Sequence, residues 1–535
     1  MRTFNVTGLC TPEKHYMVDI SGKLTQIRAM VDRGDYFTIN RARQYGKTTT
    51  LFMLEKMLRE DYTVVSTSFE GLSDESFASS AAFCRVFVRM INRALEYTDA
   101  SDEYRESWLQ ENLADFEELS VHITKMCKPG IERTGKKLVL MIDEVDKSSN
   151  NSTFLHFLGM LRQKYLEQAK NKDFTFHSVI LAGVYDIKNI KLKMINEGVY
   201  TLAEGENKIY NSPWNIAANF KVDMSFSPDE IASMLAEYEN DHDSGMDIPL
   251  IAGEIHRFTS GYPFLVSRIC QYIDEDLNKG WTHQSIQEAV QRIIPERNTL
   301  FDDLYKNLEN NKALYDLIYD ILMLGVKRTY AVGSPVVDIA DIYGIIKEAD
   351  QSVVVSNMMF ELAICNYFIA KDEAMPKKRI TGVVQRDVVD GEQFDMELCL
   401  TKFAEHYAEI YSERDAEFIE REGRLLFLSY LKPLINGQGF YHIESQFTDL
   451  RRMDIVVDFS REQFIIELKL WKGEAEHGKA YEQLAGYLSS KGSSTGYLLT
   501  FDFRKGIDKQ PYAKWVDFEG KHIFDVVVST KKSIP

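Results

Sequence analysis

The sequence predicts an α/β protein with a helix-covered parallel sheet in its N-terminal part and a smaller α/β domain at its C-terminal end. Three observations support this fold class. Short β-prone runs alternate with helix-like segments over the first two hundred residues, as in sheets whose strands are joined by crossover helices. A mainly helical stretch begins near Ser227, and alternating strands return after Gly439.

Composition limits the classes of protein that fit the chain. A length of 535 residues implies several domains, and 44% hydrophobic with 27% charged residues is typical of a globular protein. The net charge of −18 argues against a surface coated for nucleic acid but leaves room for a local basic groove. The six cysteines form no CxxC pair. With no secretory signal and no apolar run of about 20 residues, we expect a cytoplasmic protein that does not contact membranes.

The N-terminal sheet is expected to contain four short strands, each rich in β-branched or other apolar residues. They are Tyr36–Asn40, Tyr62–Phe69, Lys137–Asp143 and Phe176–Val184. A helix is expected over 48–59, because Leu51, Leu54 and Leu58 recur at helical spacing.

Helical patterns dominate the middle of the chain. Ser227, Pro228 and the acids after them make a good helix start. A hairpin predicted from Gly344 to Val355 suggests a winged-helix-like region; its next helix, over 357–370, is apolar, which favours a structural cover over DNA reading. The predicted domains are a core over 1–225, a helical lid over 226–310, the winged-helix-like region over 311–374, a linker over 375–391 and a C-terminal domain over 392–535.

The strongest N-terminal motif is a glycine-lysine turn between a strand and a helix. Such a turn can hold a phosphate against backbone N–H groups at the positive end of a helix, with a lysine on the outer phosphates and a hydroxyl on Mg²⁺. The alternative is an ordinary turn, since GKT alone is common. The candidate nucleotide-binding residues are Arg41, Arg43, Gln44, Tyr45, Gly46, Lys47, Thr48 and Thr49.

An apolar strand that ends in two acids supplies the other half of the site. Asp143 is expected to hold Mg²⁺ together with Thr48, and Glu144 to act as the general base that polarises water. The combination predicts ATP and Mg²⁺ as cofactors of an ATPase. The alternative without function is a strand whose acidic end is simply exposed to solvent. A small-molecule kinase is disfavoured because such kinases usually lack the Asp-Glu pair.

The segments His15–Asp19 and Tyr36–Thr48 resemble the AAA-ATPase-like family of bacterial proteins, in which an Arg-rich loop commonly replaces the first glycine of the phosphate loop. The segment Ser212–Ala217 is similar to a family segment that follows the fourth core strand. Gly261–Pro263 resembles the Gly-x-Pro of STAND-type signalling ATPases, where a lid helix begins. The resemblance implies a P-loop ATPase fold over roughly residues 5–370.

The same resemblance suggests further nucleotide contacts. Arg268 is a candidate γ-phosphate sensor, with a solvated helix arginine as the alternative. Arg41 and Arg43 would contact phosphate or a neighbouring subunit, which is compatible with a homo-oligomer. Tyr185 and Asp186 follow the fourth strand, where a polar sensor often sits.

The C-terminal domain contains a second charged motif in an apolar hairpin. Asp454 is followed thirteen residues later by Glu467, with Lys469 on the same face of the strand. Paired strands would bring the three together, and Mg²⁺ would neutralise the acids and activate water. An exposed amphipathic hairpin with a Glu–Lys pair is the alternative.

This arrangement resembles the PD-(D/E)XK nuclease superfamily, with Gln483 on the following helix placed as in many such enzymes. Glu444 and Glu422 are candidates for an extra acid, and Arg451 and Arg452 for contacts with a phosphate backbone. The resemblance implies an α/β restriction-endonuclease-like domain, a Mg²⁺-dependent nuclease and a nucleic-acid partner, with DNA favoured. The competing hypothesis is a STAND-like switch whose C-terminal domain binds without cutting.

Overall fold

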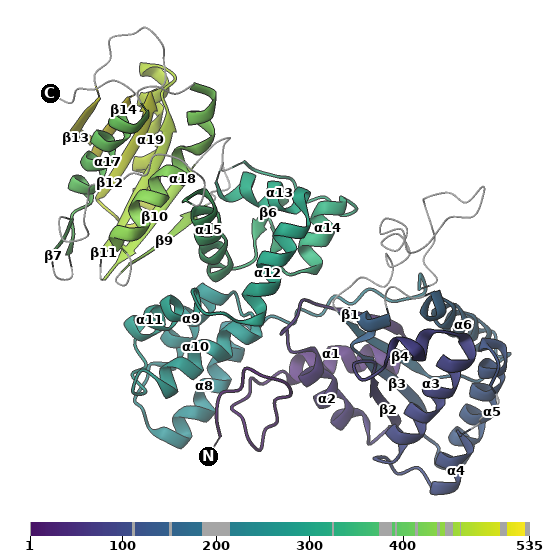
Figure 1. Cartoon of the computed structure of the whole chain (residues 1–535). Helices are drawn as coiled ribbons and strands as arrows, with labels where there is room; N and C mark the ends of the chain where they lie inside the picture. The colour runs from purple at the N-terminus through teal and green to yellow at the C-terminus, as the bar shows by residue number, and fades with distance from the viewer. Residues whose placement is uncertain are drawn as a thin grey trace, which may run out of the picture. The chain divides into compact units, whose positions relative to one another are not determined.

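The computed structural model divides the chain into two compact units (Figure 1). The first comprises Met1–His256, Gly261–Gly280 and Ile342–Gly344, and the second comprises Arg257–Ser260, Trp281–Asp341 and Ile345–Pro535. The structure describes residues 2–109, 113–148, 152–183, 214–323, 326–373, 388–390, 393–411, 416–435, 439–444, 453–460, 462–502 and 511–529. Most of the predicted linker and the candidates Tyr185, Asp186, Arg451 and Arg452 therefore lie outside the described residues.

The first unit is built on a parallel sheet whose strand order is β1-β4-β3-β2. Its strands are β1 (Tyr36–Asn40), β2 (Tyr62–Ser68), β3 (Lys137–Asp143) and β4 (Ser178–Gly183). The four predicted strands are confirmed within two residues at each end. Strands β3 and β4 have almost no exposed side chains, as expected for a sheet covered on both faces.

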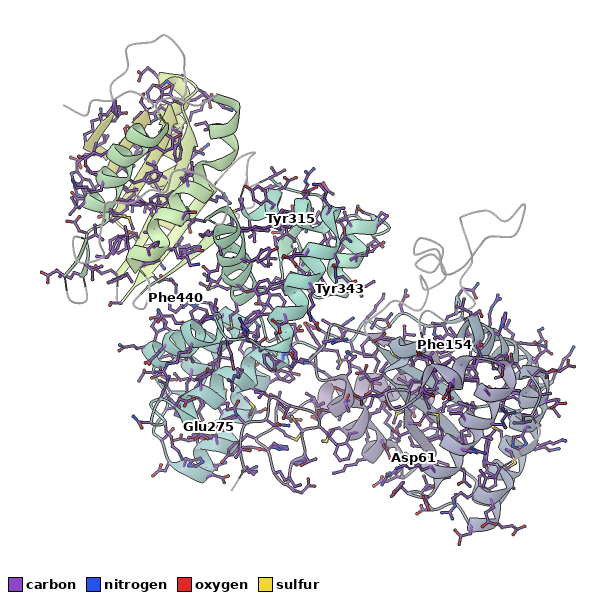
Figure 2. The ribbon with its side chains drawn as sticks, viewed as in Figure 1. Asp61, Phe154, Glu275, Tyr315, Tyr343 and Phe440 are labelled. Atoms are coloured by element: carbon purple, nitrogen blue, oxygen red, sulfur yellow. The ribbon has the colours of Figure 1, made fainter. Side chains whose placement is uncertain are left out.

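Helices surround this sheet (Figure 1). They are α1 (Ser21–Asp32), α2 (Lys47–Leu58), η1 (Asp74–Phe77), α3 (Ser80–Leu95), α4 (Asp102–Ser107), α5 (Phe116–Thr134), η2 (Val145–Ser148) and α6 (Ser152–Ala169). Phe87 of α3, Ile123 of α5 and Phe154 of α6 share one core with Leu140 of β3. Phe154 is labelled in Figure 2. This aromatic-rich core packs the helices tightly against the sheet and so holds the strands in fixed positions.

The described part of the first unit also contains α8 (Pro228–His242), α9 (Ile248–Thr259), whose last residues belong to the second unit, and α10 (Pro263–Glu275). Helix α8 starts with a capping box, because Ser227 Oγ accepts from Glu230 N and the Glu230 carboxylate accepts from Ser227 N. The N-terminal segment is attached to this helix by stacking of Phe4 on Tyr238 and by ion pairs of Arg2.

The second unit begins with helices α11 (His283–Ile293), α12 (Thr299–Asn310), α13 (Lys312–Leu322), α14 (Pro335–Ile342) and α15 (Met358–Glu373). The antiparallel hairpin β5 (Ile346–Ala349) and β6 (Ser352–Val355) lies between the last two. The predicted hairpin is confirmed. Its turn uses Asp350 and Gln351, which both adopt left-handed backbone conformations.

The C-terminal part of the second unit is a mixed sheet of order β13-β14-β12-β11-β10-β9. Its elements are the short strands β7 (Val389–Asp390) and β8 (Gln393–Phe394), which pair separately, α17 (Met396–Tyr411), α18 (Ala416–Ile435), β9 (Gly439–Glu444), β10 (Met453–Phe459), β11 (Glu462–Leu470), α19 (Glu474–Lys491), β12 (Thr495–Asp502), β13 (Tyr512–Phe518) and β14 (Lys521–Ser529). Strands β9 to β11 form an antiparallel meander, and α19 crosses over to β12, which is parallel to β11.

Among the described residues, no helix combines the length and the apolar composition that crossing a bilayer requires.

Candidate functional site: a phosphate loop and a carboxylate row

The glycine-lysine turn lies between β1 and α2, at the carboxyl edge of the sheet. Gly46 precedes α2 with a left-handed backbone (φ +75°), and Gln44 is also left-handed (φ +58°). Glycine adopts this conformation without steric cost, whereas a β-carbon would be strained there. The turn therefore leads the chain directly into the positive end of α2, where an anion is favoured.

Lys47 is almost completely buried, with 6% of its surface exposed. Its ammonium donates hydrogen bonds to the carbonyl oxygens of Arg41 and Ala42, both at 3.0 Å. Burial lowers the pKa of Lys47, and the carboxylate of Asp146 is the strongest influence in the opposite direction. A buried cation beside a helix N-terminus is a strong binding site for phosphate oxygens.

The two predicted magnesium ligands are in contact. Thr48 Oγ1 donates to Asp143 Oδ2 at 2.7 Å, across 95 residues of sequence. A hydroxyl and a carboxylate oxygen at this separation suit a small cation that prefers oxygen ligands, so the two residues fit Mg²⁺. These residues would hold the ion, which would neutralise charge on the outer phosphates.

Glu144 sits immediately after β3 in a strained backbone conformation (φ +53°). Its backbone N–H donates to Asp143 Oδ1 at 2.9 Å, which fixes the turn. Burial, and then the nearby charge of Asp143, raise the pKa of Glu144. Strain and a raised pKa together are typical of a carboxylate placed for proton transfer.

Two further acids belong to the site although the sequence did not single them out. Glu70, just after β2, and Asp146, just after Glu144, line the same pocket as the phosphate loop. Both acids come shortly after the carboxyl end of a parallel strand, and this position is the sequence feature that could have identified them as site residues. A β-carbon at Gly183, the end of β4, would lie 2.5 Å from Asp146 Oδ1, so only glycine leaves room for this carboxylate.

The phosphate loop opens into a pocket of about 560 Å³. Its walls are the predicted loop residues from Arg43 to Thr49, the three acids Glu70, Glu144 and Asp146, and Gly8 from the N-terminal segment. Positive and negative groups therefore line the same pocket, as needed where a charged phosphate, a cation and an activated water meet.

A second, mainly apolar pocket of about 320 Å³ adjoins the first and shares Gly8, Gln44, Tyr45, Gly46 and Thr49 with it. It is formed by the N-terminal segment, α2, α8 and the start of α10. Its apolar lining includes Val6, Met17, Val18, Phe226, Met234 and Phe264. A flat heteroaromatic ring suits such an apolar slot beside a phosphate site.

Of the three arginines predicted to contact the nucleotide, one lines the phosphate pocket and two do not. Arg43 lines the phosphate pocket. The Arg41 guanidinium instead donates to the carbonyl oxygens of Asn40 and Val222, because the chain after Trp214 runs beside β1 and offers acceptors there. Arg268 donates to Gln271 Oε1 and covers Tyr272, and it lines neither pocket.

In the C-terminal sheet, the predicted acids occupy one row. Asp454 on β10 pairs in register with Glu467 on β11 and with Glu444 on β9. Directly opposite residues of neighbouring strands belong to the same face of a sheet. The side chains of Asp454 and Glu444, and that of Glu422 on α18, lie outside the described part of the structure.

Glu467 is completely buried, and its carboxylate contacts Lys469 Nζ at 2.6 Å. Apart from this ion pair, no hydrogen bond to either carboxylate oxygen is found among the described residues. An ionised carboxylate in this position is costly unless a cation or further donors compensate it. Gln483, the other predicted residue, is half-buried on α19 beside the fully buried Leu484.

A buried polar cluster on the same sheet face was not predicted. Asp525 on β14 is fully buried, and its Oδ2 accepts from Tyr481 and Tyr512 and contacts His477 Nε2 at 3.0 Å. His477 and Tyr481 lie one turn apart on α19, so the cluster fixes the start of this helix on the sheet. Only the tertiary pairing of β13, β14 and α19 brings these residues together, which a single sequence does not reveal.

Within the described part of the chain, no group of three or more His, Cys, Asp or Glu side chains forms a metal-binding cluster.

Comparisons with known proteins identify one family model and several similar solved structures. The family model described as the AAA-like domain matches residues 13–368. Solved structures with similarity include the Walker-type ATPase of Pyrococcus abyssi, with 10% identity, a TM-score of 0.46, and coverage of 68% of this chain and 99% of that chain. The Aeropyrum pernix ORC1 protein in complex with DNA (10% identity, TM-score 0.28, 66% and 94% coverage) and the ORC2 protein of the same organism (12%, 0.33, 67% and 96%) also match. None of the curated proteins matches the chain.

Proposed function

The chain belongs to the AAA-like domain family, and we propose that it hydrolyses ATP to control a Mg²⁺-dependent nuclease in its C-terminal domain. Membership covers residues 13–368, which include the phosphate loop and most of the lining of both pockets, whereas the lining residues from Asn5 to Cys10 precede the matched range. The coarser statement, an AAA-like ATPase domain, follows from the family. The roles of individual residues and the nuclease are our proposals.

In the proposed ATPase step, the adenine occupies the apolar pocket and the phosphates lie along the loop. The Lys47 ammonium and the N-terminus of α2 bind the β- and γ-phosphates. Thr48 and Asp143 hold Mg²⁺, which supplies charge neutralisation. Glu144 accepts the proton of the attacking water, and its raised pKa improves it as a base near neutral pH.

The observation that carries the nuclease proposal is the environment of Glu467. A fully buried carboxylate next to Lys469, in register with Asp454, is costly to maintain in an apolar sheet. A divalent cation held by the acids of this row would offset that cost and activate water at a phosphodiester. The order of elements, a three-stranded meander, a helix and a parallel strand, also supports a PD-(D/E)XK-like domain.

The test uses the full chain, Mg²⁺ and labelled single- and double-stranded DNA and RNA. Glu467→Ala and Lys469→Ala are expected to abolish cleavage and to leave ATP hydrolysis within about twofold of wild type, because the two sites share no residue. Cleavage that persists in both variants would refute the assignment of the C-terminal site.

The second candidate is a STAND-like switch, in which the C-terminal domain binds nucleic acid or protein without cutting. It is favoured by Pro263, which starts α10 and lines the apolar pocket. A lid helix that responds to nucleotide is expected to contact the nucleotide pocket in this way. Wild-type protein that hydrolyses ATP and cleaves no nucleic acid under any condition would favour this candidate.

A further inference from the structure

Two of the places where the chain passes between its compact units lie close to one side chain, that of Tyr262. The first passage separates Arg257–Ser260, in the second unit, from Gly261–Gly280, in the first. The second is the short segment Ile342–Gly344, which belongs to the first unit although its neighbours on both sides belong to the second. Tyr262 follows the first passage directly, and its ring lies close to Gly344 of the second.

Tyr262 is only 2% exposed and lies against the phosphate loop. Its hydroxyl donates to the carbonyl oxygen of Arg43 at 2.6 Å, and its ring packs edge-on against Tyr45 with centroids 4.6 Å apart. The tyrosine therefore contacts both the backbone and a side chain of the loop that is to bind phosphate. Any change in the course of this backbone acts on Tyr262.

Gly344 brings the second passage against the same loop. It has a left-handed backbone (φ +66°), and a β-carbon at this position would lie 3.1 Å from Ala42 Cβ and 3.9 Å from the Tyr262 ring. Tyr343, labelled in Figure 2, precedes it. Strand β5 begins only two residues after Gly344, and the backbone bond from Ser356 N to Ile345 O closes the hairpin. Two residues span at most about 7 Å, so a displacement of Gly344 is transmitted to the start of β5 over a short connection.

The two passages are also joined to each other within the second unit. Lys347 on β5 donates to Ser260 Oγ at 3.0 Å. Ser260 and Gly261 are both left-handed, and Gly261 is fixed because a β-carbon there would lie 2.0 Å from the carbonyl oxygen of Phe226. The turn before Tyr262 is thus held from both sides and cannot absorb a displacement freely.

We propose that Tyr262 and Gly344 couple nucleotide binding at the phosphate loop to the β5–β6 hairpin of the second unit. The coupling rests on the proposed function in one respect, namely that the loop binds ATP. The Lys47 ammonium donates to the carbonyls of Arg41 and Ala42. Bound phosphate competes for the same ammonium, so these bonds weaken and the backbone shifts at Ala42, which Gly344 approaches, and beside Arg43, whose carbonyl oxygen accepts from Tyr262.

The coupling is tested by hydrogen exchange of the hairpin amides, residues 345–355, in the full chain with and without ATP and Mg²⁺. In wild type, ATP is expected to change their exchange rates by roughly fivefold or more, the lower end of ordinary allosteric couplings. Tyr262→Phe removes only the hydroxyl, and Gly344→Ala places a methyl group against the loop. Both are expected to reduce the response to less than about twofold, with ATP binding measured separately by titration calorimetry.

Gly333→Ala is the matched control, because Gly333 is also left-handed (φ +91°) but a β-carbon there meets nothing within 4 Å. It should keep the wild-type response, which separates contact with the loop from general backbone strain. A hairpin that ignores bound ATP in wild type, or that responds normally in both Tyr262→Phe and Gly344→Ala, would overturn the coupling alone. Failure of wild type to bind ATP would instead overturn the proposed function beneath it.

Discussion

Replacing Glu467 with glutamine is expected to stabilise the C-terminal sheet in the absence of metal. The carboxylate is fully buried, and its ion pair with Lys469 is its one compensation among the described residues. A buried ion with incomplete partners costs several kcal/mol, whereas an unsatisfied neutral amide costs about 1–3 kcal/mol. Lys469 retains 20% exposure and can remain hydrated after the change. The free energy of unfolding of the variant is therefore expected to be about 1–2 kcal/mol higher than that of wild type. This difference makes hydrogen exchange of the β11 amides about five- to thirtyfold slower.

The same substitution should remove the response of β11 to Mg²⁺. If the acid row binds the ion, Mg²⁺ at a hundred times its dissociation constant adds about 2.7 kcal/mol to wild type. Hydrogen exchange of residues 463–470 measures both effects. Glu462→Gln is the control, because it is the same substitution at an exposed position of the same strand. A destabilised Glu467→Gln variant, or one that Mg²⁺ protects as strongly as wild type, would refute this reasoning.

Three further predictions concern the nucleotide site. Lys47→Ala should weaken ATP binding by about a hundredfold in calorimetry, since a charge-assisted contact to phosphate is lost; unchanged affinity would contradict its role. Glu144→Gln should lower the hydrolysis rate by about 10²–10⁴-fold with ATP binding retained. Because burial raises the pKa of Glu144 above its usual 4.5, wild-type hydrolysis should fall as pH drops through that raised value, and a rate that stays level there would exclude it as the base. Gly183→Ala should displace Asp146 and cost about 1–3 kcal/mol in denaturant unfolding, whereas Gly159→Ala, where a β-carbon meets nothing, should be neutral or stabilising.

Local sequence patterns predicted the elements that carry the site. Strand β3 was recognisable because of its apolar run, and α8 because Ser227 and Pro228 are followed by acids beside the positive end of the helix. Thr48 and Asp143 were predicted to hold one Mg²⁺ ion, from the phosphate-loop motif and the acid at the carboxyl end of β3, and the structure places the two side chains in contact. These features depend on neighbours in sequence or on a general property of parallel sheets.

Features set by tertiary packing were missed. The apolar pocket depends on residues near the N-terminus, such as Val6, whose loop has no periodic pattern. Arg41 was predicted to contact phosphate or a neighbouring subunit, and its hydrogen bond to the carbonyl oxygen of Val222, far along the chain, was not predicted. The cluster around Asp525 joins β14 to Tyr481 and His477, which precede Asp525 in the sequence by 44 and 48 positions. No local pattern predicts such a pairing.

The most direct test of the central claim is cleavage of labelled DNA by the full chain with Mg²⁺, across a titration of ATP. Wild-type protein should cleave at a rate that changes with ATP, and Lys47→Ala should cleave at a rate that ATP does not alter. Cleavage by wild type that is indifferent to ATP would contradict control by the nucleotide. The absence of cleavage at every ATP concentration would contradict the nuclease.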